Sequence, residues 1–182
     1  MSLGRKGAIA TALAVALLAG GAGCGVDLGD RDVVEGEPLE LGDIAFNVQL
    51  TRFLNPTDRE DAEYLQGQQV PPPPGKAYLA VFMQVNNESA DDLPLPGPTD
   101  MTVVDTTGAK YTPIASNSLF ALDLGGTILA HTDLPEEDTA AKAGPTGGSI
   151  VFFLVDEGVS ENRPLELEVT SGGEKGRIEL DI

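Results

Sequence analysis

The stretch AYLAVFMQVNNES, Ala77 to Ser89, carries the strongest strand signal in this sequence. With a side-chain period of two, one face of the predicted strand holds Leu79, Val81, Met83 and Val85, and the other holds Tyr78, Ala80 and Phe82. A strand that is apolar on both faces is typical of the centre of a packed β-structure. We therefore expect this stretch to be a central strand with other elements packed on each side.

Other segments show the same period. Ile44, Phe46, Val48 and Leu50 alternate with polar residues, which predicts a half-buried strand. Residues 100–114, DMTVVDTTGAKYTPI, are typical of two strands joined by a turn at Thr106-Thr107-Gly108, where the glycine supplies a positive φ. Residues 149–157, SIVFFLVDE, form a second continuous apolar strand.

The C-terminal residues 163–182 predict a hairpin whose turn is Ser171-Gly172-Gly173. Its apolar residues are Leu165, Leu167 and Val169 on one strand, placed opposite Ile178, Leu180 and Ile182 on the other. Counting all these segments gives about seven to eight short strands in a chain with 22 glycines and 13 prolines. The fold class that they predict is all-β, an antiparallel immunoglobulin-like β-sandwich over residues 38–182. The label is architectural, since the chain has no Trp.

Three loops interrupt the strand pattern, at 55–75, 90–100 and 123–147. The first has a charged half that predicts a short helical turn, followed by prolines 71–74, which favour a stiff extended segment. A rigid sandwich displays function on its connections, so these loops are the candidate contact surfaces. An exposed apolar patch near Ser118 to Leu124 would favour a binding role.

The N-terminus has the order of a secretory signal: Arg5 and Lys6, then the apolar Ala8 to Leu18, then small residues up to Cys24. Gly21, Ala22 and Gly23 resemble a lipobox, the site where bacterial lipoproteins are acylated on cysteine and cleaved before it, although its first position is usually aliphatic. We expect residues 1–23 to be a lipoprotein signal peptide and Cys24 to be lipidated. Ordinary secretion, or an uncleaved anchor from Gly7 to Val26, are the alternatives.

The composition of the remaining chain predicts a tether, an acidic surface and a single domain. Residues 24–37 alternate acids and glycines, which predicts a flexible acidic tether before the domain at 38–182. The chain has 29 acidic and 11 basic residues, and loss of the signal peptide with Arg5 and Lys6 leaves a net charge of −20. Such a surface repels nucleic acid, so we expect no nucleic-acid partner. At this length we expect a single domain and a monomer.

Several segments in this order resemble a known family: the strand ending in VNN, Val85 to Asn87, the pattern VVD-x-x-G-x-x-Y from Val103 to Tyr111, and an apolar strand after a Gly-rich approach. They resemble the telokin-like, immunoglobulin-like extracellular domains of actinobacterial and firmicute lipoproteins, a family of unknown function. The resemblance covers roughly residues 38–182, with one departure, a loop at 55–75 that is longer than expected between the corresponding strands. It implies a fold and an extracytoplasmic location, and brings no catalytic residues with it.

Few residues carry recognisable chemistry. His131 is the only histidine, and Asp133 with Ser116 or Ser118 could complete a Ser-His-Asp set, but no nucleophile-elbow pattern accompanies them. A copper or thiol site would need ligands that this chain lacks. Calcium is the one candidate metal, because three acidic stretches could supply oxygen ligands: Asp58–Glu63, Glu88–Asp92 and Leu134–Thr139. None of these stretches has the spacing of an EF-hand. We expect no catalytic residue, no cofactor and no metal site.

These observations favour a lipid-anchored protein on the outer face of the bacterial cytoplasmic membrane, with a non-catalytic binding or interaction role in the cell envelope. Its expected partners are the membrane, through lipidated Cys24, and an envelope protein. The alternative is a surface lipoprotein that binds calcium or a small ligand.

Overall fold

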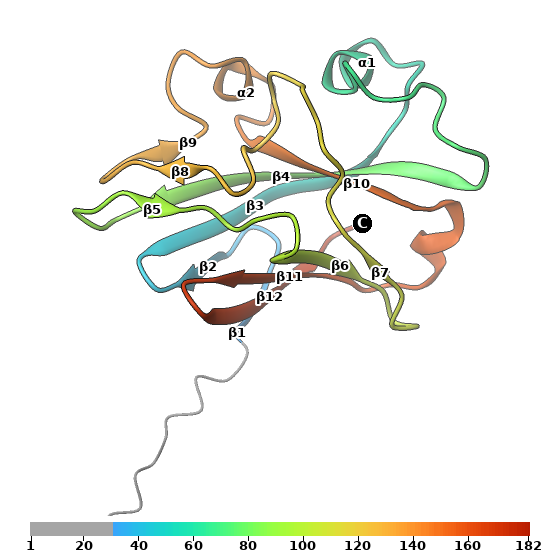
Figure 1. The fold of residues 1–182 in the computed structure, drawn as a ribbon. Coiled ribbons are helices and arrows are strands. Elements are labelled where there is room, and N and C mark those ends of the chain that lie inside the picture. Colours follow the sequence, from blue (N-terminus) through green and yellow to red (C-terminus); the bar gives the residue numbers. More distant parts are fainter. Residues whose placement is uncertain (1–30) are drawn as a thin grey trace, which may run out of the picture.

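Lys76–Asn87 forms β4, the central strand of the larger layer in the computed structural model, which describes residues 31–182 (Figure 1). Its neighbours are β3 (Ile44–Leu54) and β10 (Ser149–Asp156), both antiparallel to it. Beyond β3 lies β2 (Pro38–Leu41), and β9 (Asp133–Leu134) pairs with the end of β4. Residues 78–83 of β4 are buried without interruption, which confirms the predicted central strand.

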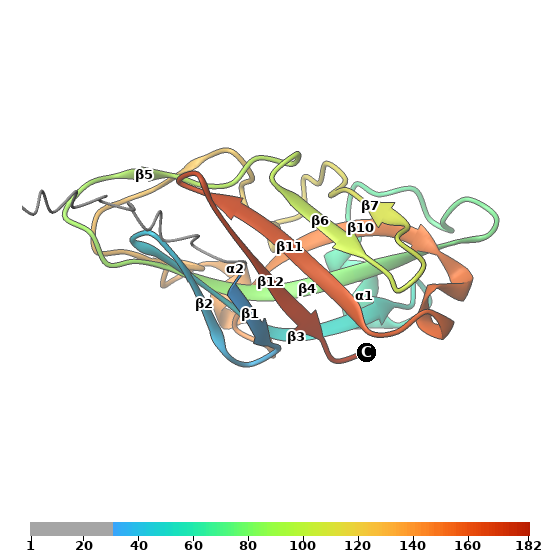
Figure 2. The same ribbon diagram turned by 90° about the horizontal axis from the view of Figure 1, so that it is seen from below.

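The second layer is a sheet in the order β1-β12-β11-β6-β7 (Figure 2). Its strands are β1 (Arg31–Val34), β6 (Met101–Val104), β7 (Lys110–Tyr111), β11 (Leu165–Ser171) and β12 (Glu174–Leu180). A small third sheet pairs β5 (Leu93–Pro94) with β8 (Thr127–Ile128). The two layers form the predicted all-β sandwich, and among the named strands of residues 31–182 every pairing is antiparallel except that of β1 with β12.

The main core lies between the two layers and follows from the alternation of each strand. Leu79, Val81 and Met83 of β4 face it, and none of the three exposes any of its surface. The opposite sheet contributes the alternate residues of its strands, among them Met101, Val103, Leu165, Leu167 and Ile178.

A second apolar cluster covers the other face of β4 and its neighbours. Tyr78, Ala80 and Phe82 point to this side, where they pack with Ile150 and Phe152 of β10. The cover is α1 (Arg59–Tyr64) together with residues 114–121, both of which lie above this sheet in Figure 1. This is why β4 needs apolar residues on both faces.

The C-terminal hairpin forms as predicted, with a small difference in register. Leu165 pairs with Leu180 and Leu167 with Ile178, so Ile182 lies beyond the last pair. The turn consists of Gly172 and Gly173, which have φ values of 59° and 85°. A two-residue turn with two positive φ values matches the twist of the strands that it joins, and glycine is the residue that adopts it without strain.

The folded domain begins earlier than the sequence predicts. Residues 31–37, expected in the flexible tether, form β1 and a turn instead. The backbone N–H of Gly36 donates to the carbonyl of Val48, at 2.8 Å, and Val33 packs against the main core. A short β1 next to β12 was missed because two of its four residues are charged, and parallel pairing with the last strand has no local sequence signal.

The irregular regions contain short elements. The charged part of loop 55–75 forms α1, the predicted helical turn, and residues 123–147 contain α2 (Ala140–Ala143) as well as β8 and β9. A 3₁₀ turn, η1 (Glu157–Glu161), follows β10. Within residues 31–182, no helix is long and apolar enough to cross a membrane.

Candidate functional site

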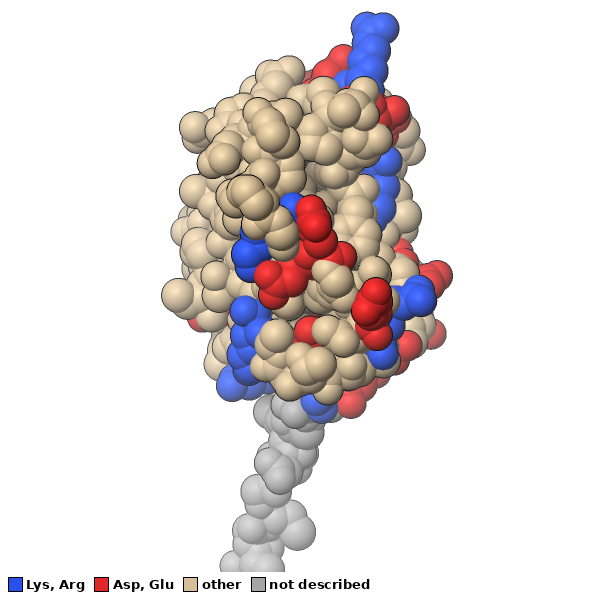
Figure 3. Space-filling model, turned by 90° about the vertical axis from the view of Figure 1, so that its right-hand side faces the viewer, with Lys and Arg blue, Asp and Glu red and all other residues tan. Residues whose placement is uncertain are grey.

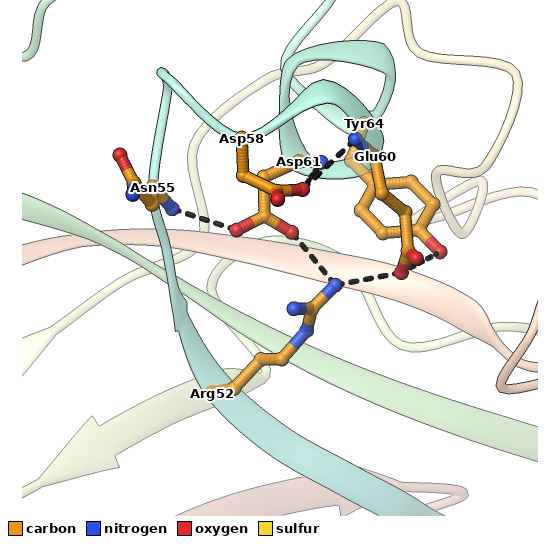
Figure 4. A network of polar contacts seen from close by, with 6 residues as sticks. All are labelled: Arg52, Asn55, Asp58, Glu60, Asp61 and Tyr64. Atoms are coloured by element: carbon orange, nitrogen blue, oxygen red, sulfur yellow. Dashed lines mark hydrogen bonds and ion pairs between the residues drawn. The ribbon is translucent and has the colours of Figure 1, made fainter.

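A network of polar contacts attaches α1 to the covered face of the larger sheet (Figure 4). Arg52, on β3, points up from the sheet and its Nη2 lies 2.7 Å from Oδ1 of Asp61 and 2.9 Å from Oε1 of Glu60. Asp61 is only 3% exposed, and its Oδ2 accepts a hydrogen bond of 2.7 Å from the backbone N–H of Asn55. The carboxylate of Asp61 therefore holds both the loop entering α1 and the guanidinium beneath it.

The start of α1 is fixed by its own residues. Asp58 is the N-cap, and its Oδ1 accepts hydrogen bonds from the backbone N–H groups of Glu60 and Asp61, at 2.9 and 3.2 Å. The helix has only six residues and cannot be stable without tertiary contacts. Its position above the sheet therefore depends on this cap, on the ion pair with Arg52 and on the burial of Tyr64.

Tyr64 is the apolar anchor of α1. Its ring is edge-on to Phe82 and to Phe120, with centroid distances of 5.4 and 4.8 Å, and Arg52 lies 5.7 Å from its centroid. The hydroxyl donates to Glu60 at 3.0 Å. Burial, reinforced by this hydrogen bond, raises the pKa of Tyr64 to about 12.

A groove of 600 Å³ lies between α1 and α2, and we call it the helix groove. Tyr64 and Phe120 line it, and Gly144 lines it from the α2 side. The α1 side carries Asp58, Arg59, Glu60 and Glu63, and the α2 side carries Ala140, Ala143, Gly144 and Pro145. The groove thus joins an aromatic and small apolar lining to a rim with a net negative charge.

The helix groove lies where two of the three predicted contact loops meet. Its walls come from loop 55–75 and loop 123–147, and Phe120 comes from the stretch Ser118 to Leu124. Leu119, next to Phe120, is 78% exposed, the highest value among the exposed large hydrophobic residues of the described chain. The third predicted loop, 90–100, contains β5 and pairs with β8 instead.

The end of the sandwich at which β4 begins carries both signs of charge (Figure 3). Lys76 contacts Asp156 at 2.6 Å, and Tyr111 donates to the same carboxylate at 3.2 Å. These two hydrogen bonds, that from Lys76 first, lower the pKa of Asp156. The pKa of Asp105 is lowered as well, first by the hydrogen bond from the Thr107 side chain and then by those from the backbone of Thr107 and Ala109 and from the side chain of Asn162. Each carboxylate is thus satisfied within the turn or strand end that it organises.

The residues of the hypothetical Ser-His-Asp set lie in different surroundings. His131 is exposed, and its backbone N–H donates to the carbonyl of Ser89. The carboxylate of Asp133 accepts a hydrogen bond from the side chain of Asn86. Ser116 and Ser118 line a groove beside β10 that neither His131 nor Asp133 lines.

The three acidic stretches weighed for calcium also have local roles. Asp58 caps α1, Asp61 pairs with Arg52, Asp92 accepts from the backbone N–H of Ala130, and Glu137 pairs with Lys142. Among residues 31–182, no group of three or more His, Cys, Asp or Glu side chains is arranged to hold a metal ion. Cys24, the predicted lipidation site, lies outside the described residues.

Comparison with known proteins agrees with the fold. No protein-family model matches the sequence, and no curated protein matches it. An uncharacterized β-sandwich protein from Clostridium difficile superposes with a TM-score of 0.52 at 18% identity, covering 84% of this chain and 95% of that one. The yjhA protein from Bacillus subtilis gives a TM-score of 0.52 at 12% identity, covering 82% of this chain and 99% of its own.

A secreted protein from Mycobacterium tuberculosis, MPT63, also superposes, with a TM-score of 0.51 at 13% identity over 83% of this chain and 98% of that one. At such identities these likenesses show a shared fold. This chain is therefore a β-sandwich domain of the kind found in these proteins, of which the first is uncharacterized.

Sequence reasoning missed Arg52 as the centre of the site. The only signal was a basic residue in period with Ile44, Phe46, Val48 and Leu50, which were predicted to share one face. A bulge between Val48 and Leu50 instead turns Leu50, Arg52 and Leu54 to the covered side of the sheet. A charge at an apolar position of a strand calls for a buried partner of opposite sign, and the acidic run 58–63 is the nearest one in sequence.

Proposed function

We propose that this protein is a lipid-anchored extracytoplasmic β-sandwich that binds a partner protein of the cell envelope through the helix groove, without catalysing a reaction. The signal pattern ending at Cys24 supports the anchor, and the resemblance to telokin-like lipoprotein domains supports the location. The fold that it shares with a secreted mycobacterial protein is consistent with that location.

The helix groove carries the proposal. Its volume of 600 Å³ lies within the range of binding pockets, and its lining includes the aromatic residues Tyr64 and Phe120. The exposed Leu119 is the neighbour of Phe120 in the sequence. Contiguous exposed apolar surface marks interaction sites in soluble domains. The acidic rim of α1 favours a partner whose contact surface combines apolar and basic side chains.

The anchor would also orient this groove. Six residues, 25–30, separate Cys24 from Arg31 at the start of β1, and the seven steps from Cα to Cα span at most about 24 Å when fully extended. β1 belongs to the lower layer in Figure 1, whereas α1 and α2 lie above the upper one. A lipid on Cys24 would hold the lower layer near the membrane and direct the helix groove away from it.

Site-specific photocrosslinking in cells tests the proposal. A benzophenone amino acid replaces Ala143, which is exposed and lines the helix groove, and in a matched variant it replaces Thr102 on the open face of the lower layer. We expect a discrete envelope protein to be captured from position 143 and not from position 102. Equal capture from both positions, or none from 143, would contradict the assignment of the groove.

The anchor is tested separately with Cys24→Ser. We expect this variant to be lost from membranes after a carbonate wash, because the acyl chains are attached to that thiol. Retention of both wild type and variant would show that lipidation at Cys24 does not hold the protein. This result would leave the test of the helix groove intact, since the crosslinking depends on the folded domain.

A further inference from the structure

Residues 113–122 run along the outer edge of β10 and bond to it at two separate places. At one place the backbone N–H of Ile114 donates to the carbonyl of Phe152, at 2.8 Å. At the other, Ile150 donates to the carbonyl of Phe120 at 2.7 Å, and Leu122 donates to the carbonyl of Ile150 at 2.9 Å. The remaining edge of β10 between these two places contains the backbone N–H of Phe152.

That N–H points away from β4. In an antiparallel strand the N–H and C=O of one residue point to the same side, and the C=O of Phe152 points outward to Ile114. Among residues 31–182, no hydrogen-bond acceptor for the N–H of Phe152 is found. Phe152 is only 1% exposed, and a buried backbone donor without a partner is both rare and costly.

The missing acceptor results from the path of the covering segment. After Ile114 the chain leaves the edge of β10 and returns only at Phe120, and the side chain of Gln68 holds the intervening arch through the carbonyl of Ala115, at 2.9 Å. Under the arch lies a groove of 630 Å³, which we call the edge groove. Its lining includes Ile114, Ser116, Ala121, Leu122, Ile150 and Phe152.

We propose that the edge groove binds a neutral amide ligand, whose carbonyl oxygen accepts the hydrogen bond from the N–H of Phe152. The apolar residues of the lining suit the body of such a ligand, and the volume is that of a small-ligand site. An anion is disfavoured, because Asp123 also lines the groove and the chain carries a net charge of −18. The same chemistry is supplied by a free small amide or by an extended peptide that adds to the strand edge.

The test is a nuclear magnetic resonance titration of the full-length isotope-labelled chain. The two probes are N-methylacetamide, as the small amide, and the blocked tripeptide acetyl-Ala-Val-Ala-amide, as the extended peptide. We expect the amide proton of Phe152 to move downfield with saturation and to exchange more slowly with solvent. Saturation by both probes at similar concentrations identifies a small-amide site, and at least tenfold tighter binding of the tripeptide identifies a peptide site.

Two variants in which phenylalanine replaces an alanine show where the probes bind. Ala115→Phe places a ring in the edge groove, and Ala143→Phe places one in the helix groove, both at exposed positions. We expect Ala115→Phe to weaken probe binding at least tenfold and Ala143→Phe to leave it unchanged. An unmoved Phe152 resonance, or equal binding by wild type and Ala115→Phe, would overturn the proposal and leave water as the partner of this N–H.

The unpartnered N–H itself is tested by replacing Phe152 with its α-hydroxy analogue, which turns that backbone amide into an ester. Because this N–H makes no bond within the protein, we expect probe binding to be lost while the melting temperature falls only slightly, by the cost of the weaker ester carbonyl of Val151 that faces β4. The same replacement at Phe153, whose N–H points toward β4, is the control and should lower the melting temperature. Loss of stability at both positions alike would show that Phe152 donates within the fold. Neither outcome affects the helix groove, so this proposal can fail without the proposed function.

Discussion

The two outer faces of the sandwich contrast sharply. The outer face of the β10-β4-β3 sheet is covered by α1 and residues 114–121 and contains a second apolar cluster. The outer face of the β12-β11-β6 sheet lies open, and its outward residues are mostly polar, among them Thr102, Glu166, Glu168, Thr170 and Arg177. Both faces contain an arginine that pairs with carboxylates, Arg52 on the covered face and Arg177 on the open one.

The difference lies in what surrounds each ion pair. Asp61, the partner of Arg52, has a side chain that is 4% exposed, whereas Asp32, the partner of Arg177, is 64% exposed. An exposed pair gains little, since water solvates both charges almost as well. Removal of one partner of a buried pair leaves a charge without compensation. A covered face therefore makes its ion pair essential, and an open face makes it dispensable.

The largest expected effect comes from Asp61→Ala. The substitution leaves Arg52 without its buried partner beneath α1 and removes the acceptor of the Asn55 N–H. We expect the free energy of unfolding to fall by about 3 kcal/mol. Urea denaturation followed by circular dichroism measures it.

Asp32→Ala is the matched control on the open face, because it also removes one carboxylate from an arginine. We expect a loss below about 0.5 kcal/mol. Similar losses for the two variants would show that the cover over Arg52 does not exclude water, and the contrast between the faces would then fail.

The second prediction concerns alkaline pH. Because the pKa of Tyr64 is about 12 in the folded protein and 10.0 ordinarily, the unfolded chain loses this proton first. The contribution of Tyr64 to stability is therefore complete below pH 10 and is lost as the pH rises to 12. Titration of tyrosinate absorbance should show the highest of the three tyrosine pKa values near 12, and Tyr64→Phe should remove it.

Glu60→Gln sharpens this prediction. It removes the carboxylate that accepts the hydrogen bond from Tyr64 and repels the negative tyrosinate. We expect the pKa of Tyr64 to move down toward 10 while remaining above it, since burial is the larger cause. An unchanged value would mean that burial accounts for the whole shift.

The open layer and the main core could be predicted from sequence far better than the covered face. Strands such as Leu165–Ser171 alternate cleanly, because one side meets the core and the other meets water. Gly172 and Gly173 identify the turn of their hairpin by composition alone. The apolar residues on both sides of β4 indicated that something covers it, but not what does.

The covering elements escaped prediction because their contacts join residues distant in sequence. Phe120 meets Tyr64, and the arch at Ala115 is held by Gln68, with no periodicity to reveal either contact. The loops at 55–75 and 123–147 were predicted to be contact surfaces, whereas their convergence on one groove required the fold. β1 was missed for the same reason, since its partner β12 is the last strand of the chain.

A smaller effect than that of Asp61→Ala is expected on the open layer, at Gly173. Its φ of 85° is unfavourable for a residue with a Cβ, although the space around it is empty. Gly173→Ala should therefore cost about 1 kcal/mol through backbone strain alone. Gly158→Ala is the control, at a glycine of η1 that also has open space around it but no positive φ. This substitution should leave the melting temperature unchanged or slightly higher.

Since the β11–β12 hairpin does not contribute to either groove, Gly173→Ala should lower stability and leave probe binding in the edge groove intact. Loss of binding as well would mean that the two layers are coupled, and that the open face helps to shape the covered one.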